Sequence, residues 1–213
     1  MGHKCKCLIV DDHPIFRKGI RNLLSQEAAC TAIVEADCAA TALAAIRREP
    51  WDLLILDVAL PDKHGLEVLK EVKLLRPKLP VLMLSLYPER EFALRAFKAG
   101  ASAYLTKDGP PSELLSAVKE VVAGRRYITG SLADQLMDFL DSGQPATPHA
   151  ILSDREMEVL RLLGQGKRPS QIADEMALSV KTISTYRARL LEKLGLQSTA
   201  QLVRYAIEHR LTT

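Results

Sequence analysis

The alternation of two hydrophobic patterns over the first 125 residues is the feature that most limits how this chain can fold. Short apolar runs predict strands, and the segments between them have the spacing of amphipathic helices. Because the runs are continuous in Leu, Ile and Val, we expect strands buried on both faces, in a doubly wound α/β domain with a five-stranded parallel sheet. The expected strands are Cys5–Val10, Ala32–Glu35, Leu53–Leu56, Val81–Leu84 and Ala103–Thr106, and the expected helices are Ile15–Leu24, Ala39–Ile46, Leu66–Leu75, Glu89–Ala99 and Ser112–Ala123.

The alternation ends near residue 125, which predicts a second domain of another kind. Residues 126–142 have the pattern of one more amphipathic helix, and the two prolines and one glycine in residues 143–149 indicate a linker. From Leu152 onward every periodic segment is helical. We therefore expect a first domain over 1–125, a linker helix and linker over 126–149, and a small all-α domain of four helices over 150–213.

The excess of positive over negative charge lies in this expected second domain. Residues 150–213 hold ten Lys and Arg against seven Asp and Glu, whereas the rest of the chain holds 19 of each kind. The excess equals the net charge of the whole chain, +3. A positive excess confined to a small domain is the sign expected where that domain meets a polyanion.

No apolar run approaches the ~20 residues that a membrane span requires. The N-terminus also has no long apolar stretch before a cleavage site, so secretion is not expected. The four cysteines are too few for a disulfide scaffold in a chain of 213 residues. These observations predict a cytoplasmic protein without a membrane contact.

Polar side chains follow four of the expected strands. Asp11 and Asp12 follow the first, Asp57 the third, Ser85 the fourth and Lys107 the fifth. Carboxyl ends of parallel strands meet at one edge of a sheet, so these groups should lie together. Three carboxylates repel one another, and a hard cation such as Mg²⁺ would relieve the repulsion. An ionised aspartate beside that cation can attack phosphorus, with the serine and lysine holding the phosphoryl oxygens. Helix capping would explain any single aspartate, but not five polar groups at four strand ends.

These residues resemble the receiver domain of bacterial two-component response regulators, which is flavodoxin-like. The resemblance covers about 120 residues and implies that Asp57 accepts the phosphoryl group. It also implies that Asp12, Asp57 and the backbone carbonyl of Ala59 bind Mg²⁺ and that Asp11 assists, mainly through water. Ser85 and Lys107 would contact the phosphoryl group, and Tyr104 would be an aromatic switch that turns inward when the serine moves. The matching segments are Val10-Asp11-Asp12, Leu56-Asp57-Val58-Ala59-Leu60-Pro61-Asp62-Lys63-His64-Gly65, Ser85 and Tyr104-Leu105-Thr106-Lys107.

Capping signals divide the C-terminal region into helices. Ser153 and Glu156 fit a capping box, Pro169 can begin the next helix, and Ser179 can cap a longer helix that stops at Gly195. Two helices joined by a tight turn, the second longer and basic, suggest a helix-turn-helix.

The longer helix has two different faces. Its apolar face carries Ile183, Leu190 and Leu194, together with Tyr186. The opposite face is small, polar and basic, as is needed to enter a DNA major groove. An ordinary solvated face is the competing interpretation. The candidate DNA-contacting residues are Lys181, Thr182, Ser184, Thr185, Arg187, Ala188 and Arg189.

The string from Leu152 to Gly195 resembles the LuxR-type DNA-binding domain, so the whole chain resembles a NarL/FixJ-type response regulator. The resemblance implies a transcription regulator rather than an enzyme. Its expected partners are a sensor histidine kinase and double-stranded promoter DNA with paired half-sites. We also expect a homodimer on phosphorylation or DNA binding, and contact with RNA polymerase is compatible with this role.

Two other classes of protein share parts of this pattern. An aspartate-based phosphotransfer enzyme would use Asp57 as a nucleophile, but such enzymes usually need a second acid two residues later, where this chain has Ala59. A ligand-sensing LuxR-type receptor would need a roomy aromatic-lined pocket, and only 5% of this chain is aromatic. Turnover of a free phosphomonoester would support the first alternative, and a co-purified ligand the second.

Overall fold

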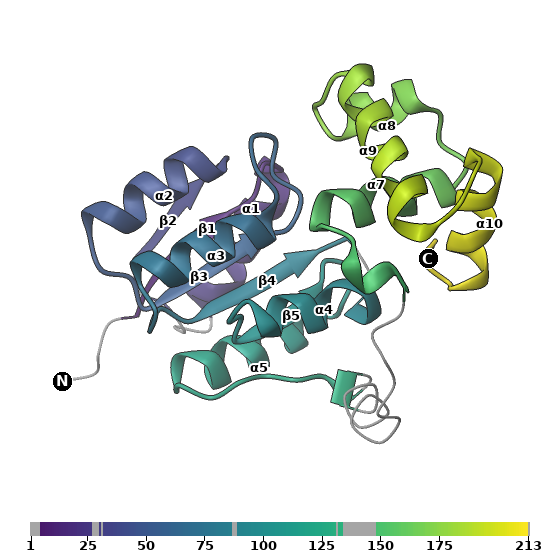
Figure 1. The fold of residues 1–213 in the computed structure, drawn as a ribbon. Helices are drawn as coiled ribbons and strands as arrows, with labels where there is room; N and C mark the ends of the chain where they lie inside the picture. The colour runs from purple at the N-terminus through teal and green to yellow at the C-terminus, as the bar shows by residue number, and fades with distance from the viewer. Residues whose placement is uncertain are drawn as a thin grey trace. The chain divides into compact units, whose positions relative to one another are not determined.

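The computed structural model describes residues 5–26, 30, 32–86, 89–130, 132–133 and 148–212. The chain divides into two compact units, residues 1–138 and residues 139–213 (Figure 1). Within the described ranges, the helices are all too short or too polar to cross a lipid bilayer.

The first unit contains the five-stranded parallel sheet that the sequence predicts. The order across the sheet is β2-β1-β3-β4-β5, which is the flavodoxin-like order of a doubly wound sheet. The central strand β3 and its neighbour β4 are buried along their whole length, as their runs of four apolar residues predict. The strands are β1 (Lys6–Val10), β2 (Ala32–Ala36), β3 (Leu53–Asp57), β4 (Val81–Ser85) and β5 (Ala103–Thr106).

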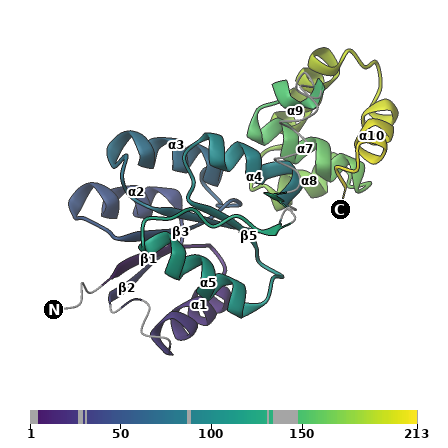
Figure 2. The same cartoon turned by 90° about the horizontal axis from the view of Figure 1, so that it is seen from below.

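Helices cover both faces of the sheet (Figure 2). Helices α1 and α5 pack on one face, and α2, α3 and α4 pack on the other. Side chains alternate between the two faces along each strand, so Ile9, Ile55 and Leu105 share a core with α1 and α5. The helices are α1 (Pro14–Gln26), α2 (Ala39–Arg48), α3 (Gly65–Leu75), α4 (Glu89–Lys98) and α5 (Pro111–Val122).

The helix expected over residues 126–142 begins later than predicted. Tyr127 instead forms a parallel bridge with Ala103, and its amide donates to the carbonyl of Ser102 at 2.9 Å. This pairing extends the edge of the sheet beyond β5, and helical geometry starts at Gly130. The apolar spacing could not reveal a backbone pairing of this kind. Residues 134–147, which include most of the expected linker, lie outside the described residues.

Residues 148–212 of the second unit form a short 3-10 turn, Pro148–Ile151, followed by four α-helices. Helix α7 lies at its centre and packs against the three others. The apolar side chains of α7 and α8 are buried with Ile183 and Leu190 of α9 and with Leu202 and Ala206 of α10. The helices are α7 (Asp154–Gly164), α8 (Pro169–Glu175), α9 (Val180–Leu194) and α10 (Thr199–Glu208).

Candidate functional site

Asp57 is the last residue of β3, and its side chain is only 2% exposed at the carboxyl edge of the sheet. Lys107, just beyond β5, directs its ammonium at this carboxylate, and the distance from Nζ to Asp57 Oδ2 is 2.6 Å. The same Nζ lies 2.7 Å from Asp11 Oδ2. The other oxygen of Asp57 accepts a hydrogen bond from the amide of Ala59 at 3.1 Å. The structure therefore brings together three of the predicted residues, with the carboxylates of Asp11 and Asp57 on either side of the Lys107 ammonium.

The start of α3 holds the backbone of Asp57 in place. A Cβ added at Gly65 would lie 2.2 Å from the carbonyl oxygen of Asp57, so only glycine fits there. The Gly65 amide donates to the carbonyl of Val58 at 2.7 Å. His64 caps the helix by accepting from the amide of Leu66, and its ring is fully buried and stacks on Phe92. None of these packing contacts was predicted from the sequence.

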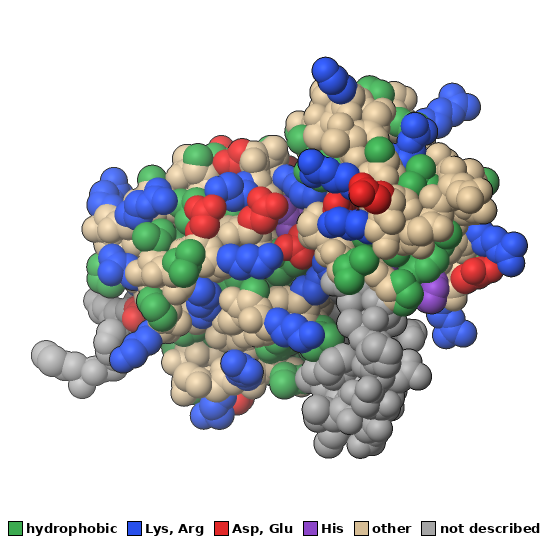
Figure 3. Space-filling model, in the orientation of Figure 1, with side chains coloured by type: hydrophobic (Ala, Val, Ile, Leu, Met, Phe, Trp, Pro, Cys, Tyr) green, Lys and Arg blue, Asp and Glu red, His purple; other side chains and the backbone are tan. Residues whose placement is uncertain are grey.

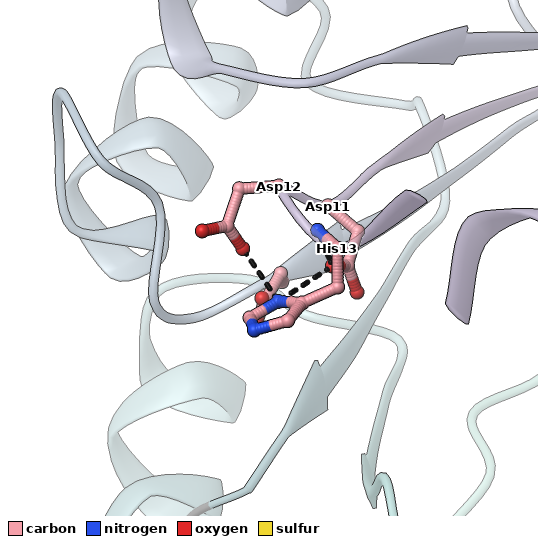
Figure 4. A group of neighbouring side chains, drawn as sticks. Asp11, Asp12 and His13 are labelled. Atoms are coloured by element: carbon pink, nitrogen blue, oxygen red, sulfur yellow. Dashed lines mark hydrogen bonds and ion pairs between the residues drawn. The ribbon is translucent and has the colours of Figure 1, made fainter. Parts of the chain in front are cut away.

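Asp11 and Asp12 leave β1 on the turn toward α1 (Figure 4). Asp11 is buried, whereas the side chain of Asp12 is 35% exposed. One ligand atom from each of Asp11, Asp12, His13 and Asp57 can lie within 4.8 Å of the others. His13 was not predicted as part of this cluster. Its Nδ1 lies 2.7 Å from Asp12 Oδ1 and 3.3 Å from Asp11 Oδ1, and its position directly after two aspartates is the signal that could have found it.

The charges in this cluster perturb one another. Burial raises the pKa of the Asp57 carboxyl to about 6, with Lys107 lowering it and Asp11 raising it further. Burial of the Lys107 ammonium opposes its charge, but Asp57 and Asp11 outweigh burial and raise its pKa. Where burial and neighbouring carboxylates oppose the ionisation of a carboxyl group in this way, an added cation is especially favourable.

Ser85 lies on β4, which neighbours the strand of Asp57, and Tyr104 lies on β5, the next strand across the sheet. Ser85 ends β4 and is buried, and its carbonyl accepts from the Lys107 amide at 2.7 Å. The register pairs Ser85 with Thr106, so Tyr104, two residues earlier, lies on the same face of the sheet as Ser85. The Tyr104 side chain is 1% exposed, which places the ring inside the unit.

The donor atoms fit a small hard cation. Carboxylate oxygens from Asp11, Asp12 and Asp57 converge without a thiolate among them, and such oxygen sets suit Mg²⁺. A cation bound there would favour the ionised form of Asp57, whose pKa burial raises. The arrangement can thus hold a divalent cation beside a nucleophilic carboxylate and a fixed ammonium.

Helix α9 of the second unit begins where the sequence predicts. The Ser179 hydroxyl accepts from the Thr182 amide at 3.1 Å, and Gly195 forms the C-cap in a left-handed conformation. The predicted capping box of α7 is also present between Ser153 and Glu156. Ala177, in the turn between α8 and α9, has a φ of 51°, which tightens the connection between the two helices.

The apolar and polar faces of α9 are arranged as the sequence predicts. Ile183 and Leu190 are buried, and Tyr186 and Leu194 are half-buried. In the space-filling view, Lys and Arg side chains project from the end of this unit formed by α8 and α9 (Figure 3). Of the candidate DNA-contacting residues, Lys181, Ser184, Thr185, Ala188 and Arg189 are exposed, whereas Thr182 and Arg187 are half-buried.

Two hydroxyls on the exposed face of α9 bond to their own helix. Ser184 donates to the carbonyl of Val180 at 3.0 Å, and Thr185 donates to the carbonyl of Lys181 at 3.1 Å. Their protons are therefore engaged, and outward they offer acceptor lone pairs and, from Thr185, a methyl group. Lys193, by contrast, pairs with Glu156 of α7 at 2.6 Å and belongs to the internal packing.

An acidic sheet edge with a fixed lysine, followed by a helix-turn-helix unit, defines the class of two-component response regulators with a DNA-binding output. Two family models match the chain. They are "Response regulator receiver domain" over residues 7–119 and "Bacterial regulatory proteins, luxR family" over residues 150–206. The chain belongs to the NarL/FixJ-type response regulators, in which a receiver domain precedes a LuxR-type DNA-binding domain. The family and function predicted from the sequence are thereby confirmed: the chain is a DNA-binding transcription regulator of a two-component system.

Individual relatives match over almost the whole chain. The response regulator UvrY of Escherichia coli strain K12 is 31% identical over 205 residues, covering 96% of this chain and 94% of UvrY. The DNA-binding transcriptional activator DevR/DosR of Mycobacterium tuberculosis is 38% identical over 95% of this chain and 94% of its own length. The structure of RcsB from Salmonella enterica serovar Typhimurium bound to promoter rprA, in the presence of phosphomimetic BeF₃⁻, is 25% identical. It covers 95% of this chain and 98% of RcsB, with a TM-score of 0.64.

Proposed function

We propose that Asp57 accepts a phosphoryl group from a sensor histidine kinase and that this modification controls DNA binding by α9. The observation that carries the proposal is the contact of Lys107 with both Asp57 and Asp11 at the carboxyl edge of the sheet. This contact leaves a buried carboxylate beside a fixed cation, with Ser85 ending the neighbouring strand. The proposed output is binding to promoter DNA rather than turnover of a substrate.

The residues of the site have distinct parts in the proposed transfer. A carboxylate oxygen of Asp57 attacks phosphorus, the N–P bond of the kinase phosphohistidine breaks, and its electron pair remains on the imidazole. The Lys107 ammonium and the Ser85 hydroxyl then hold oxygens of the new acyl phosphate. Asp11, Asp12, Asp57 and the Ala59 carbonyl would hold Mg²⁺, which supplies positive charge to the phosphoryl oxygens when it is bound.

Tyr104 would report the modification to the surface of the first unit. Ser85 and Tyr104 occupy the same face of neighbouring strands, so movement of the serine toward the phosphoryl group changes the space beside the ring. A charge added at one buried position is then read by a two-state packing arrangement. Support for this role comes from the burial of Tyr104 and from its position on the strand that pairs with the strand of Ser85.

The proposed DNA target is a promoter with paired half-sites, bound by a homodimer that phosphorylation favours. Support comes from RcsB, whose structure was obtained bound to promoter rprA in the presence of phosphomimetic BeF₃⁻. A homodimer places two copies of α9 on one face of the DNA, which paired half-sites match. Contact with RNA polymerase is compatible with binding at a promoter.

Phosphorylation of the purified chain tests the acceptor directly. We expect acetyl phosphate with Mg²⁺ to add one phosphoryl group to the wild type, measured by intact mass, and none to Asp57→Asn. Asp108→Asn is the matched control, because this exposed carboxylate adjoins Lys107 in the sequence without entering the cluster. Retained labelling in Asp57→Asn, on any other residue, would overturn the assignment.

A further inference from the structure

The first unit has a pocket at the edge of the sheet opposite to Asp57. Its volume is about 430 Å³, within the range of about 300–1,000 Å³ that small-molecule sites occupy. Pro80 precedes β4 and Ser102 precedes β5, so the pocket lies at the amino ends of these strands. The C-terminal ends of α3, α4 and α5 form its other walls.

The charge of the pocket lining is of one sign. Among the described residues, the lining includes five cationic side chains and no Asp or Glu. The five are Lys73, Lys78, Lys98, Arg125 and Arg126. Arg125 is paired with Glu120. Lys78 and Arg126 are exposed and make no ion pair with a carboxylate in the described part of the chain. Cations gathered around a concave surface in this way attract an anion.

Lys73 is the least exposed of the five cationic side chains. Its Nζ donates to the carbonyl of Leu79 at 2.6 Å, which leaves two further donors on the ammonium. Gly100 leaves room for its stem, because a Cβ there would lie 3.2 Å from Lys73 Cγ. The φ of Gly100, +100°, is also one that other residues rarely adopt. The backbone thus accommodates a lysine at this position.

The simplest other explanation for this cluster of cations is that they offset the partial negative charge at the C-terminal ends of the helices. Lys73 and Lys98 do lie in the last turns of α3 and α4, where carbonyl groups favour positive charge. Lys78 and Arg126, however, lie beyond the helices. Burial, followed by the charge of Arg126, also lowers the pKa of Lys73. Its surroundings therefore do not offset its charge, whereas a bound anion would.

We propose that this pocket binds a small organic polyphosphate, independently of the phosphoacceptor site. The cations supply partners for several phosphate oxygens. Pro77, Pro80 and Val121 add apolar surface to the lining, against which an organic group such as a nucleoside can pack. A ligand there would contact the ends of α3, α4 and α5 together, and would thus stabilise the first unit.

Calorimetric titration of the full-length chain tests the proposal, with tripolyphosphate and ATP as probes in EDTA so that the acidic cluster binds no metal. We expect both to bind, ATP more tightly, and the double variant Lys78→Gln/Arg126→Gln to weaken both by about ten-fold. Both side chains are exposed, so the variant should keep the melting temperature of the wild type. The control Lys18→Gln/Arg47→Gln removes two exposed cations outside the pocket and should bind as the wild type does.

Three results would overturn the proposal. The first is no binding of either probe by the wild type, and the second is equal weakening in the control variant. The third is a loss of affinity for duplex DNA, but not for ATP, in the Lys78→Gln/Arg126→Gln variant. That result would assign these cations to DNA contact. All three results are independent of whether Asp57 is phosphorylated.

Discussion

The Nζ atom of Lys107 lies 2.6 Å from Asp57 Oδ2 and 2.7 Å from Asp11 Oδ2, so one ammonium bridges two buried carboxylates. The phenyl ring of Phe16 covers the same ammonium, with its centroid 4.8 Å from Nζ. This contact ties the end of β5 to the ends of β3 and β1. A change in the charge of Asp57 therefore alters the electrostatic attraction that holds the Lys107 ammonium in place.

Replacing this lysine should change the ionisation of Asp57. Burial already raises the pKa of Asp57 to about 6, and Lys107 opposes that rise. We predict that Lys107→Met raises the pKa further, measured by carbon NMR of the aspartate carboxyl groups in metal-free protein. Lys63→Met is the control, because Lys63 pairs with Glu71 at 2.6 Å and should leave the pKa of Asp57 unchanged. An unaltered pKa in Lys107→Met would contradict the described contact.

Magnesium should stabilise the protein more at pH 7.5 than at pH 5. The folded-state pKa of Asp57 lies above its ordinary value of 3.8, so the carboxyl gains its charge in the folded protein only as the pH rises through about 6. Because the unfolded chain ionises this group near its ordinary pKa, metal-free protein loses stability as the pH rises from about 3.8 to about 6. Bound Mg²⁺ compensates for that loss by favouring the ionised group in the folded protein. Calorimetric melting with and without Mg²⁺ measures the difference.

The aspartate at position 12 offers a variant for the same experiment. Because its side chain is 35% exposed, Asp12→Ala should fold, yet its Mg²⁺ response should be much smaller. The control Asp174→Asn removes an exposed carboxylate of the second unit and should respond as the wild type does. Equal Mg²⁺ responses at both pH values, or in Asp12→Ala and the wild type, would count against the site.

Alanine substitutions at two glycines test how closely α3 packs against the backbone of Asp57. A Cβ at Gly65 would lie 2.2 Å from the Asp57 carbonyl oxygen, whereas one at Gly19 of α1 would meet nothing within 4 Å. We predict that Gly65→Ala lowers the free energy of unfolding by about 1–3 kcal/mol through overpacking. Gly19→Ala should raise it by up to about 1 kcal/mol, because alanine favours the helix. Urea unfolding measures both, and similar effects of the two variants would refute the close approach.

Much of the fold could be predicted because short continuous apolar runs alternate clearly with segments that have the hydrophobic spacing of helices. The strand Ala103–Thr106 has the predicted bounds, and the other strands and helices expected within residues 1–125 differ only at their ends. The Tyr127–Ala103 bridge could not be predicted, since backbone pairing at a sheet edge leaves no periodic signal. The positions of Asp57 and Lys107 follow from parallel strand ends, whereas the contacts of His13 depend on the path of a turn.

The exposed face of α9 should divide into two kinds of DNA contact. We predict that Lys181→Ala and Arg189→Ala weaken binding to selected and random duplexes alike, and each reduces the salt slope by about one counterion. Thr185→Ala should instead change the preferred sequence, by about 1–3 kcal/mol per lost base contact. The measurement is fluorescence anisotropy over a range of salt concentrations.

Arg204→Ala is the control for these variants, because this exposed arginine of α10 pairs with Glu208. It should leave the salt slope unchanged. If Thr185→Ala and Ser184→Ala unfolded the second unit without changing sequence preference, the face would be structural.

The central claim is that phosphorylation of Asp57 controls DNA binding, and the affinity of one full-length chain for one DNA fragment tests it most directly. The fragment is selected by the protein from a random pool, and binding is measured before and after treatment with acetyl phosphate and Mg²⁺. We predict a rise in affinity for the wild type within the range of about 5–150-fold that is typical of coupled sites, and none for Asp57→Asn. An unchanged affinity of the phosphorylated wild type, or an equal rise in Asp57→Asn, would contradict the claim.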